Sequence, residues 1–311
     1  MTASRPPGRA LVIGEALIDI VDRDGRETSY VGGSPLNVAV GLSRLGIATT
    51  FATEFADDER GRSIADHVAA AAVDVVQTAA TSAPTSTARA RIGVDGSATY
   101  DFDLSWEFGR PPETAGFSIV HVGSVGALRP PGAHRVLELI ENLSPDVLVS
   151  FDPNVRPALL PPAADTRALV DRYAARAAVV KLSDEDAEWL YPDDPSSASR
   201  RLLRAGASIV VVTRGEHGST VSTAAGDLQV AAHTVGLVDT IGAGDSYMSA
   251  LIAGLARGIG AQRVVEGRFD EHELAAAGRA AATAAGITVS RAGAAPPTTA
   301  ELDAALGRIA A

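Results

Sequence analysis

The 311-residue chain contains no cysteine. Disulfide bonds, thiol nucleophiles and thiolate metal sites are therefore excluded, and the composition fits a reducing compartment. Aromatic residues make up only 5 % of the chain. The sequence has no run of roughly eighteen apolar residues, so no membrane-spanning helix is predicted. The first nine residues include no apolar segment, which argues against a signal peptide. We expect a cytoplasmic protein.

Positive charge is also scarce. The formal net charge of −11 argues against a general role at nucleic acids or at a membrane surface. Small anionic substrates stay compatible with this charge, because a local cradle of N–H groups can bind them. Hydrophobic residues account for 46 % of the chain, with many Ala and Val, which is typical of α/β proteins. The length suggests one large domain or two modest ones.

Strand and helix patterns alternate along much of the chain. Short apolar runs predict buried strands, and longer amphipathic stretches between them predict helices. The predicted strands are 11–14, 47–53, 119–122, 147–151, 178–182, 208–213, 219–222 and 228–230, and the predicted helices are 34–45, 58–72, 132–142, 166–176, 196–205, 246–257, 271–285 and 299–309. This alternation predicts a central, mostly parallel sheet with helices on both faces.

Two stretches, 17–31 and 85–104, are predicted to form β-hairpins. In the second, apolar and charged residues alternate on both arms. Because cross-strand partners share a face, matching apolar to apolar residues requires a loop of odd length. A three-residue loop at 94–96 satisfies this and places Ala90 opposite Tyr100. One face of the hairpin is then apolar and the other charged.

The segment Asp239-Thr-Ile-Gly-Ala-Gly-Asp245 precedes an apolar helix. Gly242 and Gly244 permit a tight turn where the helix begins, and a helix start offers unpaired N–H groups and partial positive charge to an anion. Asp245 adds a carboxylate beside this cradle. Phosphoryl transfer requires such a pair, with a base for the attacking hydroxyl and donors for the moving group. A capped helix with a first-turn carboxylate is the alternative interpretation.

Other polar clusters favour the active-site interpretation. They are 151–156 (Phe-Asp-Pro-Asn-Val-Arg), 181–186 (Lys-Leu-Ser-Asp-Glu-Asp) and 212–218 (Val-Thr-Arg-Gly-Glu-His-Gly), and each follows or ends a predicted strand. Ligands of parallel α/β sheets bind at the carboxyl ends of the strands. The clusters therefore predict one site at that edge of the sheet.

The combination resembles the ribokinase-like carbohydrate kinases, also called the PfkB family. The resemblance runs from Val12-Ile-Gly-Glu-Ala-Leu-Ile-Asp19 to the tail that begins at Gly293. Residues 239–245 resemble the C-terminal signature of the family, and Gly32-Gly33 with Asn37 resembles its N-terminal signature. The sequences of residues 33–37, 151–156 and 181–186 are most similar to the fructokinase branch. No Walker-type Gly-x-x-x-x-Gly-Lys segment is present, so the chain is not a P-loop kinase.

The resemblance implies a fold and a set of roles. The fold is a ribokinase-like α/β domain spanning 1–311, with a small β lid formed by about 16–33 and 85–106. The implied catalytic residues are Asp245 as general base and the backbone of Gly242, Ala243 and Gly244 as anion hole. The implied sugar-binding residues are Asp19, Asn37 and Arg156, with Gly32 and Gly33 as the hinge of the lid.

The resemblance also implies ligands of ATP and of metal ions. Lys181, Thr213, Gly215 and Gly218 would bind the nucleotide. Asp186 would help to organise Mg²⁺, and Asp239, Ile241, Ser290 and Gly293 would form a site for a monovalent cation such as K⁺. Many family members carry Asn and Glu where this chain has Ser183 and Asp186. The shorter Asp leaves a water-mediated role for this carboxylate.

The implied activity is ATP-dependent phosphorylation of a primary hydroxyl of a ketohexose such as fructose, by a homodimer with no nucleic-acid partner. The alternatives are a 2-keto-3-deoxygluconate kinase, a ribokinase, a nucleoside kinase or, in another class, a non-catalytic sugar- or nucleotide-binding regulator. Asp245 beside the glycine-rich loop favours an enzyme. Arg156 also fits a surface charge, and Trp106 is expected to pack rather than to contact sugar.

Overall fold

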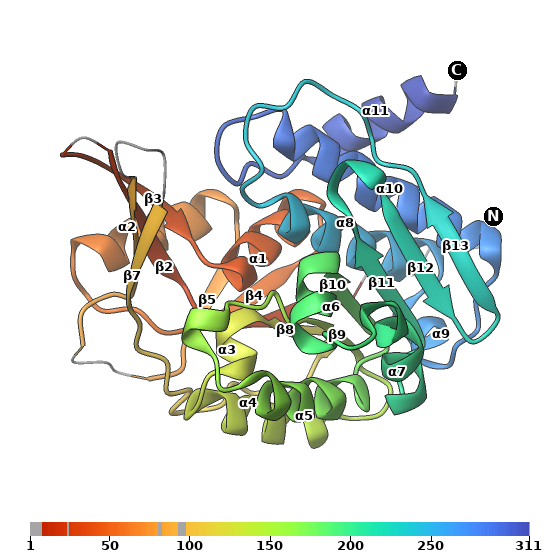
Figure 1. The fold of residues 1–311 in the computed structure, drawn as a ribbon, viewed down its shortest axis with the longest axis horizontal. Coiled ribbons are helices and arrows are strands. Elements are labelled where there is room, and N and C mark those ends of the chain that lie inside the picture. Colours follow the sequence, from red (N-terminus) through yellow and green to blue (C-terminus); the bar gives the residue numbers. More distant parts are fainter. Residues whose placement is uncertain (1–7, 24, 80–82, 93–97, 311) are drawn as a thin grey trace.

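The computed structural model describes residues 8–23, 25–79, 83–92 and 98–310. In this part of the chain nine strands form the central sheet (Figure 1). In spatial order they are β13 (Gly226–Val230), β12 (Ser219–Thr223), β11 (Ile209–Thr213), β10 (Val179–Ser183), β9 (Leu148–Asp152), β8 (Phe117–Gly123), β1 (Arg9–Ile13), β4 (Thr49–Thr53) and β5 (Asp74–Gln77). All pairs from β11 to β5 are parallel, whereas β12 and β13 are antiparallel. The predicted mostly parallel sheet is confirmed.

Helices cover both faces of this sheet, because successive residues of a buried strand point to opposite sides. Val12 belongs to one hydrophobic core, and its neighbours Leu11 and Ile13 belong to the other. The first face carries α1 (Ser34–Arg44), α2 (Glu59–Ala70), α8 (Ala243–Gly258), α9 (Ala261–Val265), α10 (Glu271–Val289) and α11 (Thr299–Ala310). The second face carries α3 (Ser124–Leu128), α4 (Gly132–Glu141), α5 (Ala163–Ala174), α6 (Asp184–Leu190) and α7 (Ala198–Ala205).

The strand order reverses at β1. The chain passes from β1 to β4 on one side and later returns to β8 on the other side. Ligands of open α/β sheets bind beside such a reversal, at the carboxyl ends of the strands. The topology therefore marks the end of β1, just after Ile13, as the centre of the expected site.

Four further strands form a second, small sheet beside the first (Figure 1). Their spatial order is β3 (Arg26–Gly32), β2 (Leu17–Arg23), β6 (Thr87–Ile92) and β7 (Ala98–Asp103). Both predicted hairpins are present, and the backbone of Ala90 pairs with that of Tyr100 as expected. The predicted turn at 94–96 lies outside the described residues.

The family resemblance assigned both hairpins to one small β lid, but the pairing that joins them was not predicted. They form one sheet because β2 and β6 pair in parallel. The register places Asp19, Tyr30 and Ala88 on one face of the small sheet. The other face carries Ile18 and Ile20, which are buried in the core that includes α2. The Asp19 face therefore points away from α2.

Several short elements also escaped the sequence patterns: β5, α3, α6 and α9. β5 has four residues, is mostly exposed and begins with Asp, so no apolar run marks it. α6 has seven residues and opens with three acidic ones, which read as a polar loop. No helix among the described residues is long and apolar enough to cross a membrane.

Candidate active site

The N-terminus of α8 forms one wall of the site. The helix begins at Ala243, three residues before the predicted start, and Asp245 lies in its first turn. The N-cap residue Gly242 has a left-handed backbone, with φ at 74°. A Cβ at this position would also lie 2.6 Å from the Cβ of Ala294. Only glycine satisfies both constraints. The Ala243 N–H donates to the Thr240 carbonyl at 3.3 Å, and the first bond within the helix runs from the Ser246 N–H to the Gly242 carbonyl, so the N–H groups between them have no helical partner.

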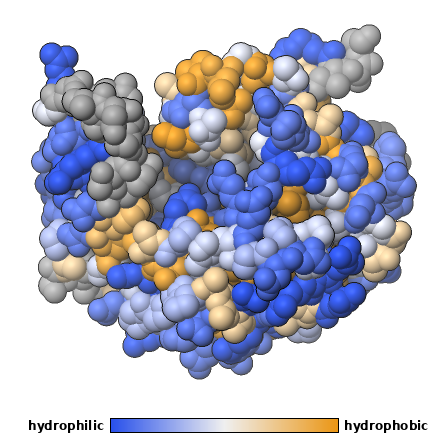
Figure 2. Space-filling model, in the orientation of Figure 1, coloured by the Kyte–Doolittle hydropathy of each residue, from blue (hydrophilic) through white to orange (hydrophobic). Residues whose placement is uncertain are grey.

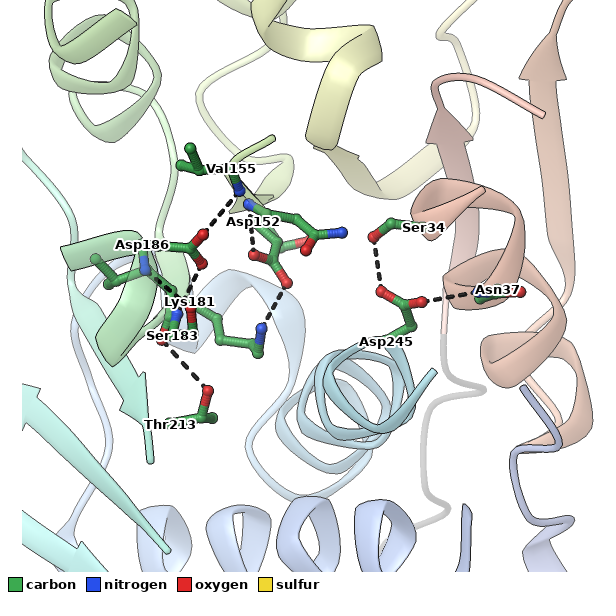
Figure 3. A network of polar contacts seen from close by, with 12 residues as sticks. Ser34, Asn37, Asp152, Val155, Lys181, Ser183, Asp186, Thr213 and Asp245 are labelled. Atoms are coloured by element: carbon green, nitrogen blue, oxygen red, sulfur yellow. Dashed lines mark hydrogen bonds and ion pairs between the residues drawn. The ribbon is translucent and has the colours of Figure 1, made fainter. Parts of the chain in front are cut away.

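The Asp245 carboxylate is buried and held from two sides (Figure 3). Ser34 Oγ donates a hydrogen bond of 2.6 Å to Oδ1, and Asn37 Nδ2 donates one of 2.8 Å to Oδ2. Burial raises the pKa of Asp245 above its ordinary value, while the two hydrogen bonds oppose this shift and the nearby Asp152 charge adds to it. A fixed carboxylate with a raised pKa is a competent proton acceptor.

In the sequence, Ser34 stands before Pro35 at the start of the predicted helix 34–45, a pattern that predicts Ser34 as the N-cap. This prediction is wrong. The N-cap is Gly33, whose φ of 113° suits glycine, and no side chain caps the helix. Ser34 is the first helical residue, and its hydroxyl bonds to Asp245 instead. A charged acceptor on another helix offers Ser34 a stronger bond than the local backbone. Asn37, expected to hold a sugar hydroxyl, donates its amide to the same carboxylate.

A buried ion pair lies on the other side of the α8 N-terminus (Figure 3). Lys181 on β10 donates a hydrogen bond of 2.7 Å from Nζ to Oδ2 of Asp152 on β9. Burial lowers the pKa of Lys181, but the carboxylate of Asp152 outweighs it and the pKa is raised. A Cβ built on Gly244 would lie 3.4 Å from Lys181 Nζ. The ammonium and the α8 N-terminus therefore present positive charge to the same space.

The family resemblance implied that Lys181 binds the nucleotide, and it implied no role for Asp152. A signal was present, since Asp152 ends a fully buried strand and is followed by Pro. Its carboxylate also accepts the N–H of Asn154 at 3.1 Å. Asp152 thus joins the β9 loop to Lys181.

Asp186 acts as a capping residue at the start of α6. Its Oδ1 accepts the N–H of Val155 at 2.7 Å, and its Oδ2 accepts the N–H of Ser183 at 2.8 Å. Burial, followed by the Asp152 charge, raises the pKa of this carboxyl. Among the described residues, no group of three His, Cys, Asp or Glu side chains could hold a metal ion unaided. Both oxygens of Asp186 keep a second lone pair, so the residue fits a metal held through water.

Asp19 faces this site from the small sheet. It is half-buried, and burial raises its pKa to about 6, while Arg156 lowers that pKa and Asp245 raises it. A Cβ on Gly32 would lie 1.9 Å from Asp19 Oδ2, so the glycine lets β3 pass close to the carboxylate. These influences place Asp19, Arg156 and Asp245 within electrostatic reach of one another.

Arg156 lies in the loop that follows β9. Its guanidinium is exposed and donates hydrogen bonds of 2.9 Å to Asn154 Oδ1 and to the carbonyl of Val155. It also lowers the pKa of Glu15, a residue that the sequence analysis did not single out. Glu15 is buried two residues beyond the end of β1, and burial raises its pKa to about 7. Glu15 lies within the segment 12–19 that carries the family resemblance, so the sequence could have pointed to it.

The predicted nucleotide-binding residues lie along the neighbouring strand. Thr213 ends β11 and pairs with Ser183 of β10, and its hydroxyl donates to the Leu182 carbonyl at 3.5 Å. Gly215 and Gly218 follow in the turn to β12, both with positive φ. A Cβ on Gly218 would lie 2.2 Å from the Val230 carbonyl. Gly218 is therefore required by the turn itself.

The four residues predicted to bind a monovalent cation lie together. Asp239 accepts the N–H of Ile241 at 3.0 Å and the N–H of Gly293 at 2.9 Å. The N–H of Asp239 donates to the Val289 carbonyl, one residue before Ser290. The Asp239 carboxylate thus fastens the loop ahead of α8 to the segment that follows α10. Carboxylate and backbone carbonyl oxygens at such a junction suit a hard cation.

An apolar surface adjoins this loop. Leu237, Val238 and Ile241 are 70 %, 64 % and 53 % exposed. Figure 2 shows hydrophobic surface at the top of the view, where the loop leading into α8 lies in Figure 1. Exposed apolar patches beside polar clefts often mark ligand or partner surfaces. The sequence patterns did not predict this patch.

The two tryptophans have structural positions. Trp106 is 2 % exposed, and its indole N–H donates to the Gly126 carbonyl at 2.8 Å. Trp189 packs against the core of the second face. Neither is a sugar platform, in agreement with the sequence-based expectation for Trp106.

Known proteins resemble this chain in sequence and in fold. Residues 8–301 match the family described as pfkB family carbohydrate kinase. A fructokinase of Rhizobium leguminosarum bv. trifolii is 33 % identical over 79 % of each chain, and one of Klebsiella pneumoniae is 32 % identical over 80 % of this chain and 85 % of that one. The crystal structure of a fructokinase with bound ATP from Xylella fastidiosa superposes with a TM-score of 0.86 at 26 % identity, over 97 % of this chain and 99 % of that one.

Proposed function

Because this chain belongs to the pfkB family of carbohydrate kinases and is an ATP-dependent sugar kinase, we propose that its substrate is a neutral ketohexose such as fructose. The reaction transfers the γ-phosphoryl group of ATP to a primary hydroxyl of the sugar. One observation carries the proposal. The buried Asp245 carboxylate stands at the N-terminus of α8, fixed by Ser34 and Asn37, with the Lys181 ammonium beside the same helix start.

These residues have complementary roles in the proposed reaction. Asp245 accepts the proton of the attacking hydroxyl, and its raised pKa favours that transfer. The N–H groups of Gly242, Ala243 and Gly244 and the ammonium of Lys181 stabilise charge on the transferring group. Lys181 keeps its own charge in a dry site because Asp152 pairs with it. Thr213, Gly215 and Gly218 bind the nucleotide at the adjoining strand ends.

The charge balance of the cleft supports a neutral sugar. The positive charge of Arg156 lowers the pKa of both Asp19 and Glu15, against the effect of burial. A carboxylate or phosphate on the sugar would have to compete with Asp19 for that guanidinium. A neutral polyol instead offers hydroxyl donors to Asp19, which accepts them when ionised. This favours fructose over 2-keto-3-deoxygluconate or a phosphorylated sugar.

Metal ions complete the proposal. Mg²⁺ would neutralise phosphate charge. The nucleotide phosphates would hold it, together with waters bound to Asp152 and Asp186. The carboxylate oxygens of these two residues already accept hydrogen bonds from Lys181 or from backbone N–H groups. A monovalent cation such as K⁺ would bind where Asp239 joins residue 241 to the 290–293 segment. There it would stiffen the loop that forms the anion hole.

We further propose that the small sheet is a lid and that two lids pair in a homodimer, with Gly32 and Gly33 as the hinge. Tyr30, on the same face as Asp19, is 51 % exposed. An exposed aromatic side chain on a sheet that flanks the cleft needs a cover, and a second lid supplies one. The cytoplasmic location predicted from the composition stays a prediction.

The substrate is tested by measuring ADP release with fructose, ribose, 2-keto-3-deoxygluconate and adenosine. We expect the highest kcat/KM with fructose. The variant Arg156→Ala should lower kcat/KM for fructose only modestly, because a neutral sugar loses hydrogen bonds but no ion pair. A wild-type preference for the acid sugar, abolished in this variant, would contradict the neutral-substrate proposal while leaving the kinase chemistry intact.

A further inference from the structure

One residue of α3, Gly126, hydrogen-bonds to residues that flank the small sheet in the sequence. The backbone N–H of Gly126 in α3 donates a hydrogen bond of 2.7 Å to Oε2 of Glu15. The carbonyl of the same residue accepts the indole N–H of Trp106 at 2.8 Å. Glu15 lies two residues before β2, and Trp106 lies three residues after β7. The chain therefore enters the small sheet and leaves it at groups that bond to Gly126.

The surrounding backbone is packed tightly around this junction. A Cβ on Gly126 would lie 2.7 Å from the Cα of Gly14 and 3.0 Å from Glu15 Oε2. A Cβ on Gly33, between β3 and α1, would lie 2.6 Å from the carbonyl oxygen of Glu15. Glu15 thus contacts a third connection of the small sheet through its backbone. Gly132 is similarly close to Trp106, with 2.4 Å between its potential Cβ and Cδ1 of the indole.

The base of the small sheet behaves as one unit. Ile18 in β2 donates its N–H to the Ser86 carbonyl at 2.9 Å, and Ser105 donates its N–H to Ser86 Oγ at 3.1 Å. These bonds tie the start of β2 to the strand ends of the second hairpin. Arg129 adds a bond of 3.2 Å to the Leu104 carbonyl. Asp19 lies in β2, four residues after Glu15. A displacement of Glu15 or of Trp106 should therefore also displace Asp19.

The junction holds two features that stability alone does not favour. Glu15 is 5 % exposed and burial raises its pKa to about 7, so its ionised form is costly to bury. Ser124, at the start of α3, has a left-handed backbone with φ at 55°. Its side chain lowers the pKa of Glu15, against the larger effect of burial. Backbone strain in a non-glycine residue persists where the surroundings over-determine it, which is common at functional sites.

We propose that Glu15 is a positioning residue for the kinase reaction, acting through the backbone of Gly126 and together with Trp106 to fix the small sheet over Asp245. This inference rests on the proposed function, because it assigns Asp19 to the sugar. Asp245 itself is held by the side chains of Ser34 and Asn37, and these two hydrogen bonds do not involve Gly126. Loss of the Gly126 anchor therefore displaces Asp19 relative to the sugar while leaving the proton acceptor in place.

The kinetic test compares Glu15→Ala, Glu15→Gln, Trp106→Phe and the Glu15→Ala/Trp106→Phe double variant in the full-length chain. Leaving the buried Gly126 N–H unpaired should raise the sugar KM by about tenfold in the Ala variant. kcat and the KM for ATP should stay within about threefold of the wild type. Glu15→Gln retains an acceptor oxygen and should restore a KM near the wild-type value.

The double variant tests whether Glu15 and Trp106 both act through Gly126. Two residues that act through one group are not additive, so its sugar KM should be close to that of the worse single variant. Trp189→Phe is the matched control, since it removes the other tryptophan of the chain without touching Gly126. Multiplicative effects, or a sugar KM in Glu15→Ala and Trp106→Phe within twofold of the control, would overturn the proposal.

A second readout does not depend on the identity of the sugar. In a Trp189→Phe background Trp106 is the sole tryptophan. Glu15→Ala should move its emission to longer wavelength and increase acrylamide quenching, because the freed Gly126 peptide no longer holds the buried indole. Glu15→Gln should leave both unchanged. If no sugar were phosphorylated, the proposed function would fail, and unchanged emission in Glu15→Ala would separately refute the anchor.

Discussion

Replacing Asp245 by Asn tests the chemistry of the site with little change of shape. The wild-type carboxylate accepts hydrogen bonds from Ser34 and from Asn37. An Asn at position 245 can direct its carbonyl oxygen toward the Asn37 amide and its NH₂ toward the Ser34 hydroxyl, which can also accept. Both contacts therefore survive, and the variant should fold. What disappears is the ability to accept a proton from the substrate.

The expected magnitude follows from that loss. A positioned base contributes roughly 10²- to 10⁴-fold in rate, or about 3 to 5 kcal/mol of transition-state stabilisation. We expect kcat of Asp245→Asn to fall at least a hundredfold, as measured by coupled ADP release. The dissociation constant for ATP, measured by calorimetry, should change little, because the N–H groups of the α8 N-terminus and Lys181 stay in place.

Two companion variants sharpen the test. Asp165→Asn is the matched control, because Asp165 is an exposed acid in the first turn of α5 and shares only the helix-dipole effect. Ser34→Ala removes a bond that lowers the pKa of Asp245, so that pKa should rise further. Activity requires the ionised base, and its acid limb should therefore move to higher pH in Ser34→Ala. A folded Asp245→Asn enzyme with kcat within tenfold of wild type would refute Asp245 as the base.

Three further predictions concern stability and assembly. Lys181→Met leaves the Asp152 carboxylate buried without its partner and should cost about 3 to 5 kcal/mol of unfolding free energy in urea titrations; the Lys181→Met/Asp152→Leu double variant should recover stability but not activity, and an equally unstable double variant would contradict this. Tyr30→Asp should yield monomers in light scattering and raise the sugar KM, whereas a wild type that is already monomeric at micromolar concentration rules out the dimer. Burial raises the folded-state pKa of Glu15 to about 7, against the opposing charge of Arg156. Its contribution to stability is therefore fully present below its ordinary pKa of about 4.5 and is lost as the pH rises through 7. Glu15→Gln should reduce the decline of unfolding free energy over this window, and an unchanged pH profile would contradict the raised pKa.

Local patterns were sufficient to predict the class of fold. Alternating apolar runs and amphipathic stretches identify strands that are buried on both faces, and these require a parallel sheet covered by helices. The alternation of Ala90 and its neighbours even fixed the register of the second hairpin, because a slip of one residue would expose the apolar face. The tight turn ahead of α8 was predicted for the same local reason, with Gly242 in the left-handed conformation, although the helix begins at Ala243 and not at residue 246. Such features depend on a few consecutive residues and are written directly in the sequence.

Partners were decided only by the tertiary structure. Serine is a favoured N-cap residue, yet Ser34 bonds to Asp245, which is 211 residues away in the sequence, because α8 packs on α1. The pairing of Lys181 with Asp152 depends on β9 and β10 being neighbours, and the parallel pairing of β2 with β6 depends on both hairpins sharing one base. The hydrophobic period of a segment indicates that one of its faces is buried, but it does not indicate which other helix or strand that face packs against. Hydrogen-bond partners, raised pKa values and the Gly126 junction therefore arise only once the elements have met.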